Sequence, residues 1–340
     1  MSAFVSGLEL SRRFYTEAVR PVLASSYPDL PYSAALLGRG SEVLGFDDEM
    51  SGDHNSEPRV ELFLRKEDRV RHGASLDELL RREVPTQFAD RPTEFGVHTV
   101  RGYFLEQLDF DVESEIKPRD WFTFPEQNLR MLTAGAVFHD EVGLQKVRDR
   151  LGYYPRDVWL YLQIAAWWRV HPEVNLAGRA GFVGDELGSA LIGAQLVHDL
   201  MQLCFLMERQ YAPYSKWFGT AFSRLACAEE LSPLFGNVLR TESWQEREEA
   251  LMAAYAGVAG VHNRLRITAP VTTGVEQLWG RPFTVVWGDF PGALLAEIKD
   301  PEVRRIAERW PVGGIDRIRD VLWAACDRRR LVALFDSGTW

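Results

Sequence analysis

The chain has 340 residues, 46% of them hydrophobic and 26% charged, so it is long enough to bury one large core or two ordinary ones. Its 39 basic and 49 acidic residues give a formal net charge of −10. A protein that coats a nucleic acid neutralises many phosphates and is normally basic, so this charge argues against extended nucleic-acid binding. A local basic pocket for one small polyphosphate is still compatible with it.

Cysteine usage and hydropathy indicate the compartment. The three cysteines are widely spaced and form no C-x-x-C pair, which is typical of a reducing cytosol and gives no metal–thiolate spacing. Residues 1–13 lack the pattern of a signal peptide, and the most apolar run, residues 158–168, is too short to span a bilayer. We therefore expect a cytoplasmic protein with no membrane partner, and the sequence leaves its oligomeric state open.

The first 145 residues mix predicted strands with predicted helices. Alternating apolar residues predict a strand at 59–65, and a short apolar run that ends in glycine predicts another at 31–38. Two more strands are predicted at 97–100 and 136–139, and helices are predicted at 8–25 and 77–83.

From residue 146 onward the pattern becomes helical. Apolar residues at helical spacing predict helices at 158–168, 185–209 and 244–265, and a strand is predicted later, at 282–287. The fold class is therefore α+β. We expect an α/β domain over 1–145 with a mixed sheet, a helical-bundle domain over 146–268, and a mixed C-terminal extension over 269–340 that packs on the other two.

One segment carries residues suited to phosphate chemistry. Residues 38–55, G-R-G-S-E-V-L-G-F-D-D-E-M-S-G-D-H-N, join the first two predicted strands. Gly40 and Ser41 at a sharp turn can present N–H groups and a hydroxyl to phosphate oxygens. Asp53, just before the next strand, can hold a hard divalent cation. On spacing alone, the alternative is a glycine-rich turn followed by a solvated acidic loop.

A strand, Gly-Ser, about ten residues and then Asp-x-Asp at the next strand resembles the nucleotidyltransferase superfamily of polymerase-beta-like and kanamycin-nucleotidyltransferase-like enzymes. More closely, the chain resembles a bacterial family of unknown function described only as nucleotidyltransferase-like. The matching segments are G-S-E-V-L-G-F-D-D-E (40–49), A-G-A-V-F-H-D (134–140), Y-Y-P-R-D-V-W-L-Y (153–161), G-D-E-L-G-S (184–189) and E-R-Q-Y-A-P-Y-S-K-W-F-G-T-A-F (208–222).

The resemblance implies that Gly40 and Ser41 contact phosphates and that Asp53 is the first metal-binding aspartate. The family pattern Asp-His-Asp-Trp-Gly-Pro-Arg is replaced here by Asp-His-Asn-Ser-Glu-Pro-Arg over 53–59, so Asn55 stands where the second aspartate belongs. An amide offers one oxygen to a cation but removes a full charge from the site. Glu57 would share the strand face of Asn55 and can compensate as a ligand.

Two later strand residues, Glu61 and His98, are candidates for the third ligand position, although such residues are more often simply solvated. A second departure from the family lies at 171–179, where the family carries a more acidic run before Gly-Arg. The two departures together indicate a specialised form of this site.

In the helical domain, the resemblance implies a glutamate that serves as general base and a lysine that contacts phosphates. Glu186 fits the first role, but helix capping explains an acidic residue at a helix start equally well. Lys216, flanked by Tyr214 and Trp217, fits the second, and Arg179 is a further anion contact.

The sequence therefore predicts a two-domain enzyme that binds a nucleoside triphosphate (NTP) with Mg²⁺ between the sheet and the helical domain. It would transfer a nucleoside monophosphate to a small hydroxylated acceptor. The alternatives are a repurposed scaffold that catalyses another, metal-independent reaction on a small molecule, and a non-catalytic nucleotide-binding module.

Overall fold

The computed structural model describes residues 4–49, 57–317 and 332–333, and the chain divides into two compact units. Of the described residues, the first unit holds 4–49, 57–116 and 124–152, and the second holds 117–123, 153–317 and 332–333. The first unit contains a mixed sheet with helices and the second is mainly helical, which confirms the predicted α+β class. The domain boundaries at 145 and 268 stay predictions.

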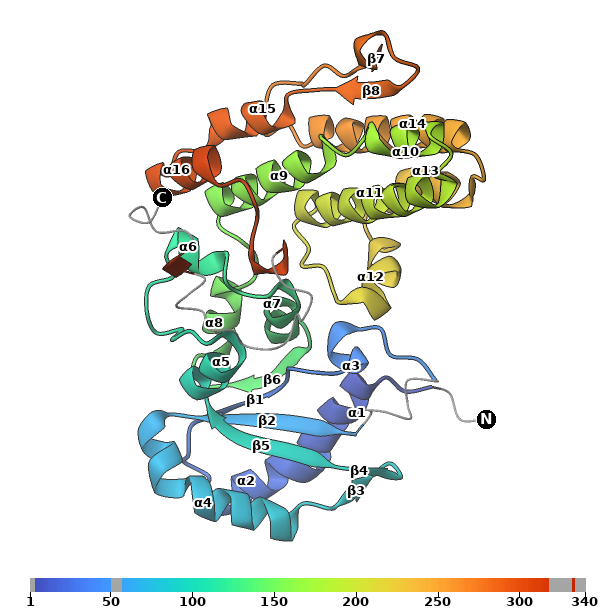
Figure 1. The fold of residues 1–340 in the computed structure, drawn as a ribbon. Helices are drawn as coiled ribbons and strands as arrows, with labels where there is room; N and C mark the ends of the chain where they lie inside the picture. The colour runs from blue at the N-terminus through green and yellow to red at the C-terminus, as the bar shows by residue number, and fades with distance from the viewer. Residues whose placement is uncertain (1–3, 50–56, 318–331, 334–340) are drawn as a thin grey trace. The chain divides into compact units, whose positions relative to one another are not determined.

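The first unit begins with a long helical segment that leads into the sheet (Figure 1). Its elements are α1 (Gly7–Phe14), the π-helical η1 (Tyr15–Val19), α2 (Arg20–Ser26), β1 (Tyr32–Leu36), α3 (Ser41–Leu44), β2 (Arg59–Leu64), α4 (Lys66–Glu83), β3 (Gln87–Phe88), β4 (Arg91–Pro92), β5 (Glu94–Thr99), α5 (Val100–Leu108), α7 (Glu126–Thr133), β6 (Ala136–Asp140) and α8 (Leu144–Arg150).

The main sheet has the strand order β5-β2-β1-β6. Strand β1 pairs antiparallel with both β2 and β6, whereas β2 and β5 run parallel. The four strands predicted for this part of the chain, at 31–38, 59–65, 97–100 and 136–139, are confirmed to within a few residues. The parallel register places Glu61 opposite Gly96 and Phe63 opposite His98.

The two faces of β2 differ in chemistry because side chains alternate along a strand. Val60, Leu62 and Leu64 point into a hydrophobic core that α1, η1, α2 and α4 also line. Arg59 and Glu61 therefore lie on the opposite face. This second face carries the polar residues of the candidate site.

The N-terminal helical segment forms one side of that core. Ser6 caps it by accepting a hydrogen bond from the backbone of Glu9. The segment runs from Gly7 to Ser26, close to the predicted 8–25, but its middle turn is π-helical. The hydroxyl of Ser11 is buried and accepts a hydrogen bond from the backbone N–H of Arg59, at 3.1 Å.

The second unit consists mostly of helices, followed by a two-stranded hairpin and two shorter helices (Figure 1). Its elements are α6 (Pro118–Trp121), α9 (Arg156–Val170), α10 (Leu176–Phe182), α11 (Glu186–Met207), α12 (Ser215–Phe222), α13 (Ala228–Arg240), α14 (Trp244–Arg264), β7 (Gly274–Gln277), η3 (Leu278–Gly280), β8 (Thr284–Trp287), α15 (Phe290–Glu297), α16 (Pro301–Arg309) and η4 (Ile315–Arg317).

Helix α9 lies at the centre of this unit and packs against α11, α15 and α16. Its Trp167 stacks on Phe290 of α15 with ring centroids 4.0 Å apart, and Tyr255 of α14 closes the same cluster. All three side chains are almost completely buried. The apolar spacing that predicts a helix at 158–168 therefore reflects a core helix.

Helix α11 is, by length and composition, apolar enough to cross a membrane. Within the unit, however, 56% of its apolar window is buried, and the helix packs against α9, α10, α13 and α14. A central core helix of a globular unit meets the same criterion.

Candidate functional site

The Gly-Ser turn follows β1 directly. Gly38 and Gly40 have φ values of +90° and +123°, which L side chains rarely adopt. A Cβ atom on Gly40 would also lie 2.1 Å from the carboxylate of Glu42. The turn therefore requires glycine at position 40 for backbone conformation and for space. Ser41 follows as the half-buried first residue of α3.

Arg59, the first residue of β2, holds this turn in place. Its Nη2 donates hydrogen bonds to the carbonyl oxygens of Leu37 and Arg39 and, at 3.2 Å, to Oε1 of Glu42. Two of these acceptors are backbone atoms of the turn itself. A charged donor makes stronger hydrogen bonds than a neutral one, so Arg59 fixes the path of the chain from β1 into α3.

Glu42 is the buried partner of Arg59. Its side chain is only 2% exposed, and its Oε2 has no hydrogen-bond partner. Burial, together with the charges of Asp47 and Glu57, raises the pKa of Glu42 to about 7 against the opposing charge of Arg59. A carboxyl group that is partly protonated at neutral pH therefore lies beside the turn.

The same face of the sheet carries a hydrogen-bonded pair of side chains from neighbouring strands. Nε2 of His98 on β5 lies 2.8 Å from Oε2 of Glu61 on β2. The side chains are 30% and 14% exposed, respectively. The rings of Tyr103 on α5 and His98 pack edge to face, with their centroids 5.0 Å apart.

Tyr103 and Arg59 connect this pair to the turn. A Cβ atom on Gly38 would lie 2.6 Å from the hydroxyl of Tyr103, so the tyrosine packs directly on the turn. On the other side, Nε of Arg59 lies 3.8 Å from Oε1 of Glu61. His98 is thus separated from the turn by a single layer of side chains.

Of the three predicted metal ligands, the described residues include Glu57 alone. Asp53 and Asn55 lie outside the described residues. Glu57 is half-buried just before β2, and its charge acts on Glu42. Across 4–49, 57–317 and 332–333, no three His, Cys, Asp or Glu side chains gather as a metal site. Glu61 and His98, the candidates for a third ligand, are neighbours but bind each other.

In the second unit, Glu186 begins α11, and the preceding Asp185 caps the helix through the backbone N–H of Gly188. Oε1 of Glu186 accepts a hydrogen bond from the backbone N–H of Trp244, and Oε2 accepts one from the buried Arg247, both at 3.2 Å. Glu186 therefore joins the starts of α11 and α14, and its predicted role as general base stays a prediction.

The predicted anion contacts are exposed. Lys216 projects from the first turn of α12, and its Nζ lies 4.7 Å from the Trp217 ring centroid, so Trp217 is an aromatic neighbour as expected. Tyr214 is the N-cap residue of the same helix. Arg179 on α10 donates to the side chain of Asn175 at 3.3 Å. Within the described ranges, no hydrogen bond or ion pair joins Lys216 or Arg179 to Glu186.

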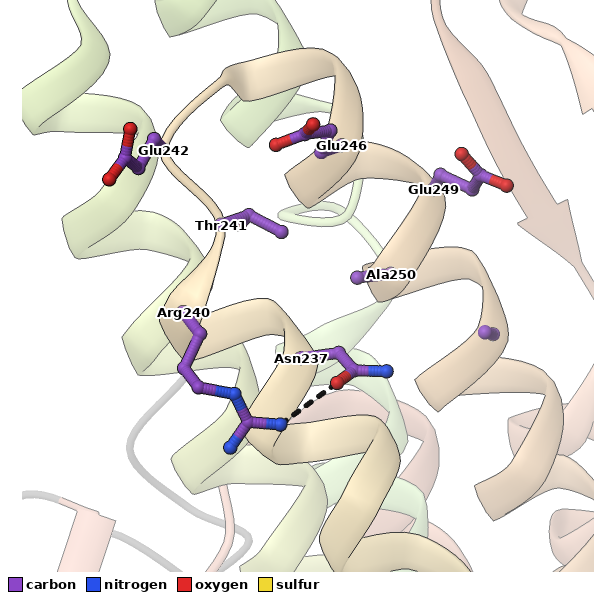
Figure 2. Close-up of a pocket in the computed structure, with 8 residues that line it drawn as sticks. Asn237, Arg240, Thr241, Glu242, Glu246, Glu249 and Ala250 are labelled. Carbon is purple, nitrogen blue, oxygen red and sulfur yellow. Dashed lines mark hydrogen bonds between the residues drawn. The ribbon is translucent and has the colours of Figure 1, made fainter.

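A groove of about 580 Å³ lies in the second unit where α13 turns into α14 (Figure 2). Three glutamates line it and make it acidic, and Arg240 donates a hydrogen bond to Asn237 on the same helix. A triphosphate would be repelled by these carboxylates. None of the predicted site residues lines this groove: it is formed by Asn237, Arg240, Thr241, Glu242, Glu246, Glu249, Ala250 and Ala253.

Sequence reasoning missed Arg59, Glu42 and Tyr103. The signal for Arg59 was present, because a charged residue begins the strand of residues 59–64 and ends the family-like segment of residues 53–59. Glu42 follows Gly-Ser directly, but only the burial of its side chain distinguishes it from the acidic residues that come next in the chain, Asp47 to Glu49. The contact of Tyr103 with the turn requires the fold.

Part of the chain matches the model of a protein family whose chemistry is undefined. Residues 121–218, less than half of the chain, match the model of a domain of unknown function, DUF4037. That range includes Arg179, Glu186, Tyr214 and Lys216 but not the Gly-Ser turn. No curated protein matches the chain.

Among solved structures, the chain is similar to a nucleotidyltransferase-like protein from Exiguobacterium sibiricum 255-15. The two chains share 10% sequence identity, and the match covers 82% of this chain and 97% of the other, with a TM-score of 0.33.

Proposed function

We propose that the protein is a nucleotidyltransferase-fold enzyme that moves a nucleoside monophosphate from an NTP to a small hydroxylated acceptor. The observation that carries the proposal is the turn from β1 into α3, in which glycines with positive φ and the Arg59 clamp shape the backbone around Gly40 and Ser41. A rigid turn of this kind presents N–H groups to phosphate without reorganisation.

The charge around the turn supports a requirement for a cation. Glu42, Glu57 and Glu61 lie on or beside this face, with Arg59 as the basic residue that contacts two of them. A triphosphate would be repelled by such a surface unless a divalent ion came with it. Carboxylate oxygens are the ligands that Mg²⁺ prefers, and the unpartnered Oε2 of Glu42 fits this chemistry.

The proposal assigns the cation to Asp53, Asn55 and Glu57. When bound, Mg²⁺ would neutralise charge on the phosphoryl oxygens. In the second unit, Lys216, Arg179 and Tyr214 are proposed nucleotide contacts, because the first two are cationic and the third is aromatic and polar. Both carboxylate oxygens of Glu186 are already engaged, by the backbone N–H of Trp244 and by Arg247, so a role as general base would require these hydrogen bonds to break.

Asp53→Ala is expected to abolish transfer while the fold stays intact. The assay is pyrophosphate release from each of the four ribonucleoside triphosphates, with Mg²⁺ or with chelator, against a panel of sugars and amino sugars. Loss of charge stabilisation at the phosphoryl group predicts a decrease in kcat of about 100-fold or more. The matched control is Asp77→Ala, which removes an exposed carboxylate that pairs only with Arg81 on α4.

Unchanged release by Asp53→Ala would contradict the proposal. Asn55→Asp separates it from the alternatives, since restoring the missing charge should increase transfer by a weakened nucleotidyltransferase. A repurposed scaffold or a non-catalytic module would gain no transfer activity from the same substitution.

A further inference from the structure

The His98–Glu61 pair has the geometry of a base and its orienting group. The two side chains come from adjacent parallel strands, and Nε2 of His98 contacts Oε2 of Glu61 at 2.8 Å. A carboxylate acceptor at Nε2 favours the tautomer with its proton on that nitrogen. Nδ1 then carries the free lone pair and can accept a proton.

Gly96 makes room for the pair. A Cβ atom at this position would lie 2.3 Å from both Oε2 of Glu61 and Nε2 of His98. The φ of Gly96 is not positive, so the backbone alone does not require glycine there. The absence of a side chain at position 96 therefore serves the hydrogen bond between the two neighbours.

The charged and titratable groups that face His98 define its surroundings. From β2 these are Glu61 and, beyond it, Arg59, and from α5 the edge of the Tyr103 ring fixes the orientation of the imidazole. Arg69 of α4 reaches β5 through the carbonyl oxygen of Val97, which lies next to His98 in the chain. The His98 side chain is 30% exposed, so part of the imidazole faces solvent.

We infer that His98 is the general base of the reaction proposed above, that its proton acceptor is Nδ1, and that Glu61 is its positioning residue. The inference rests on that proposed function. As the acceptor oxygen forms a bond to the α-phosphorus, its proton passes to Nδ1 of His98. The bond between the α-phosphorus and the bridging oxygen breaks, and pyrophosphate leaves with the electron pair.

A second histidine offers a matched control. His139 on β6 lies 3.2 Å from Glu141 and is 34% exposed, so it resembles His98 in partner and exposure. It lies on the opposite edge strand of the same sheet. Its substitution should leave transfer unchanged.

The experiment compares His98→Gln, Glu61→Gln and Gly96→Ala with His139→Gln in the full-length protein. The readouts are NTP affinity by calorimetry and kcat for pyrophosphate release between pH 5 and 9. His98→Gln is expected to lower kcat about 10²–10³-fold, to leave NTP affinity within a few-fold of wild type, and to remove the acidic limb of the pH–rate profile. In a further variant, His98→Ala, the lost side chain leaves space, so added imidazole should partly restore kcat.

Gly96→Ala and Glu61→Gln keep the imidazole but disturb its partner, so they should lower kcat less and move the acidic limb rather than remove it. The inference is overturned if wild-type enzyme transfers and His98→Gln keeps both its kcat and its acidic limb. It is also overturned if His139→Gln is equally impaired. Absence of transfer by wild-type protein would instead overturn the proposed function, and this inference with it.

Discussion

Replacing Asp199 with alanine is expected to destabilise the second unit by about 2–3 kcal/mol, because it removes a buried carboxylate that accepts hydrogen bonds from two arginines, one of them half-exposed. The Asp199 side chain, on α11, is 3% exposed. It accepts hydrogen bonds from Nε of Arg169, Nη1 of Arg317 and Nε2 of Gln195, each at 3.0 Å. The carboxylate therefore ties α9 and η4 to α11.

The contribution of Asp199 to the free energy of unfolding should depend on pH. Burial alone would raise its pKa, but hydrogen bonds from His198 and Gln195 and the charges of Arg317 and Arg169 lower it to about 2, below the ordinary value of 3.8. The folded state thus binds this proton less tightly than the unfolded state. Its contribution, about 2 kcal/mol, is present above pH 4–5 and lost as the pH falls toward 2.

Urea denaturation of wild type and Asp199→Ala at pH 7 and pH 3 measures both effects. Glu308→Ala is the matched control, since it removes a carboxylate from an exposed pair with Arg304 and should change the free energy of unfolding by less than about 0.5 kcal/mol. Equal stability of Asp199→Ala and Glu308→Ala at pH 7 would show that the cluster does not stabilise the fold.

Trp167→Ala is expected to cost about 3–5 kcal/mol, since it empties the centre of the second unit. The indole is 1% exposed and stacks on Phe290 with an interplanar angle of 9°. Its Nε1 has no hydrogen-bond partner. Trp167→Phe should therefore cost much less, because it removes an unsatisfied N–H group and leaves a smaller cavity.

The neighbouring tryptophan supplies the control for this prediction. Trp168 follows directly on α9 but is 49% exposed, so Trp168→Ala should cost less than about 1 kcal/mol. The three variants are compared by urea denaturation at pH 7. A similar loss for Trp167→Ala and Trp168→Ala would contradict the assignment of α9 as the core helix.

Periodicity and turn chemistry were sufficient to predict the main elements. The strand at 59–65 could be predicted because polar and apolar residues alternate at its start. Helix α11 could be predicted because apolar residues recur at helical spacing along 185–209. The polar helix predicted at 77–83 is the end of the longer α4, whose first half exposes mostly charged residues and so lacks an apolar stripe. Strand β7 was missed since all four of its residues are exposed.

The candidate site was less predictable, because its contacts depend on strand order. Glu61 and His98 lie 37 positions apart, and only the parallel register of β2 with β5 brings them together. The turn itself was predicted from Gly40 and Ser41, whereas the clamp of Arg59 on that turn follows from the antiparallel pairing of β1 with β2. For Glu186 the sequence offered helix capping and catalysis, whereas its hydrogen bonds to Trp244 and Arg247 depend on the packing of α11 against α14, which no local pattern predicts.

The central claim is that the protein binds a nucleoside triphosphate with Mg²⁺ through the Gly-Ser turn and Asp53. Calorimetric titration of the four ribonucleoside triphosphates into wild type and Asp53→Ala, with Mg²⁺ and with chelator, tests it most directly. We predict that wild type binds at least one triphosphate only with Mg²⁺, and that Asp53→Ala loses this binding. Absence of binding to wild type, or binding that is indifferent to both Mg²⁺ and the substitution, would contradict the claim.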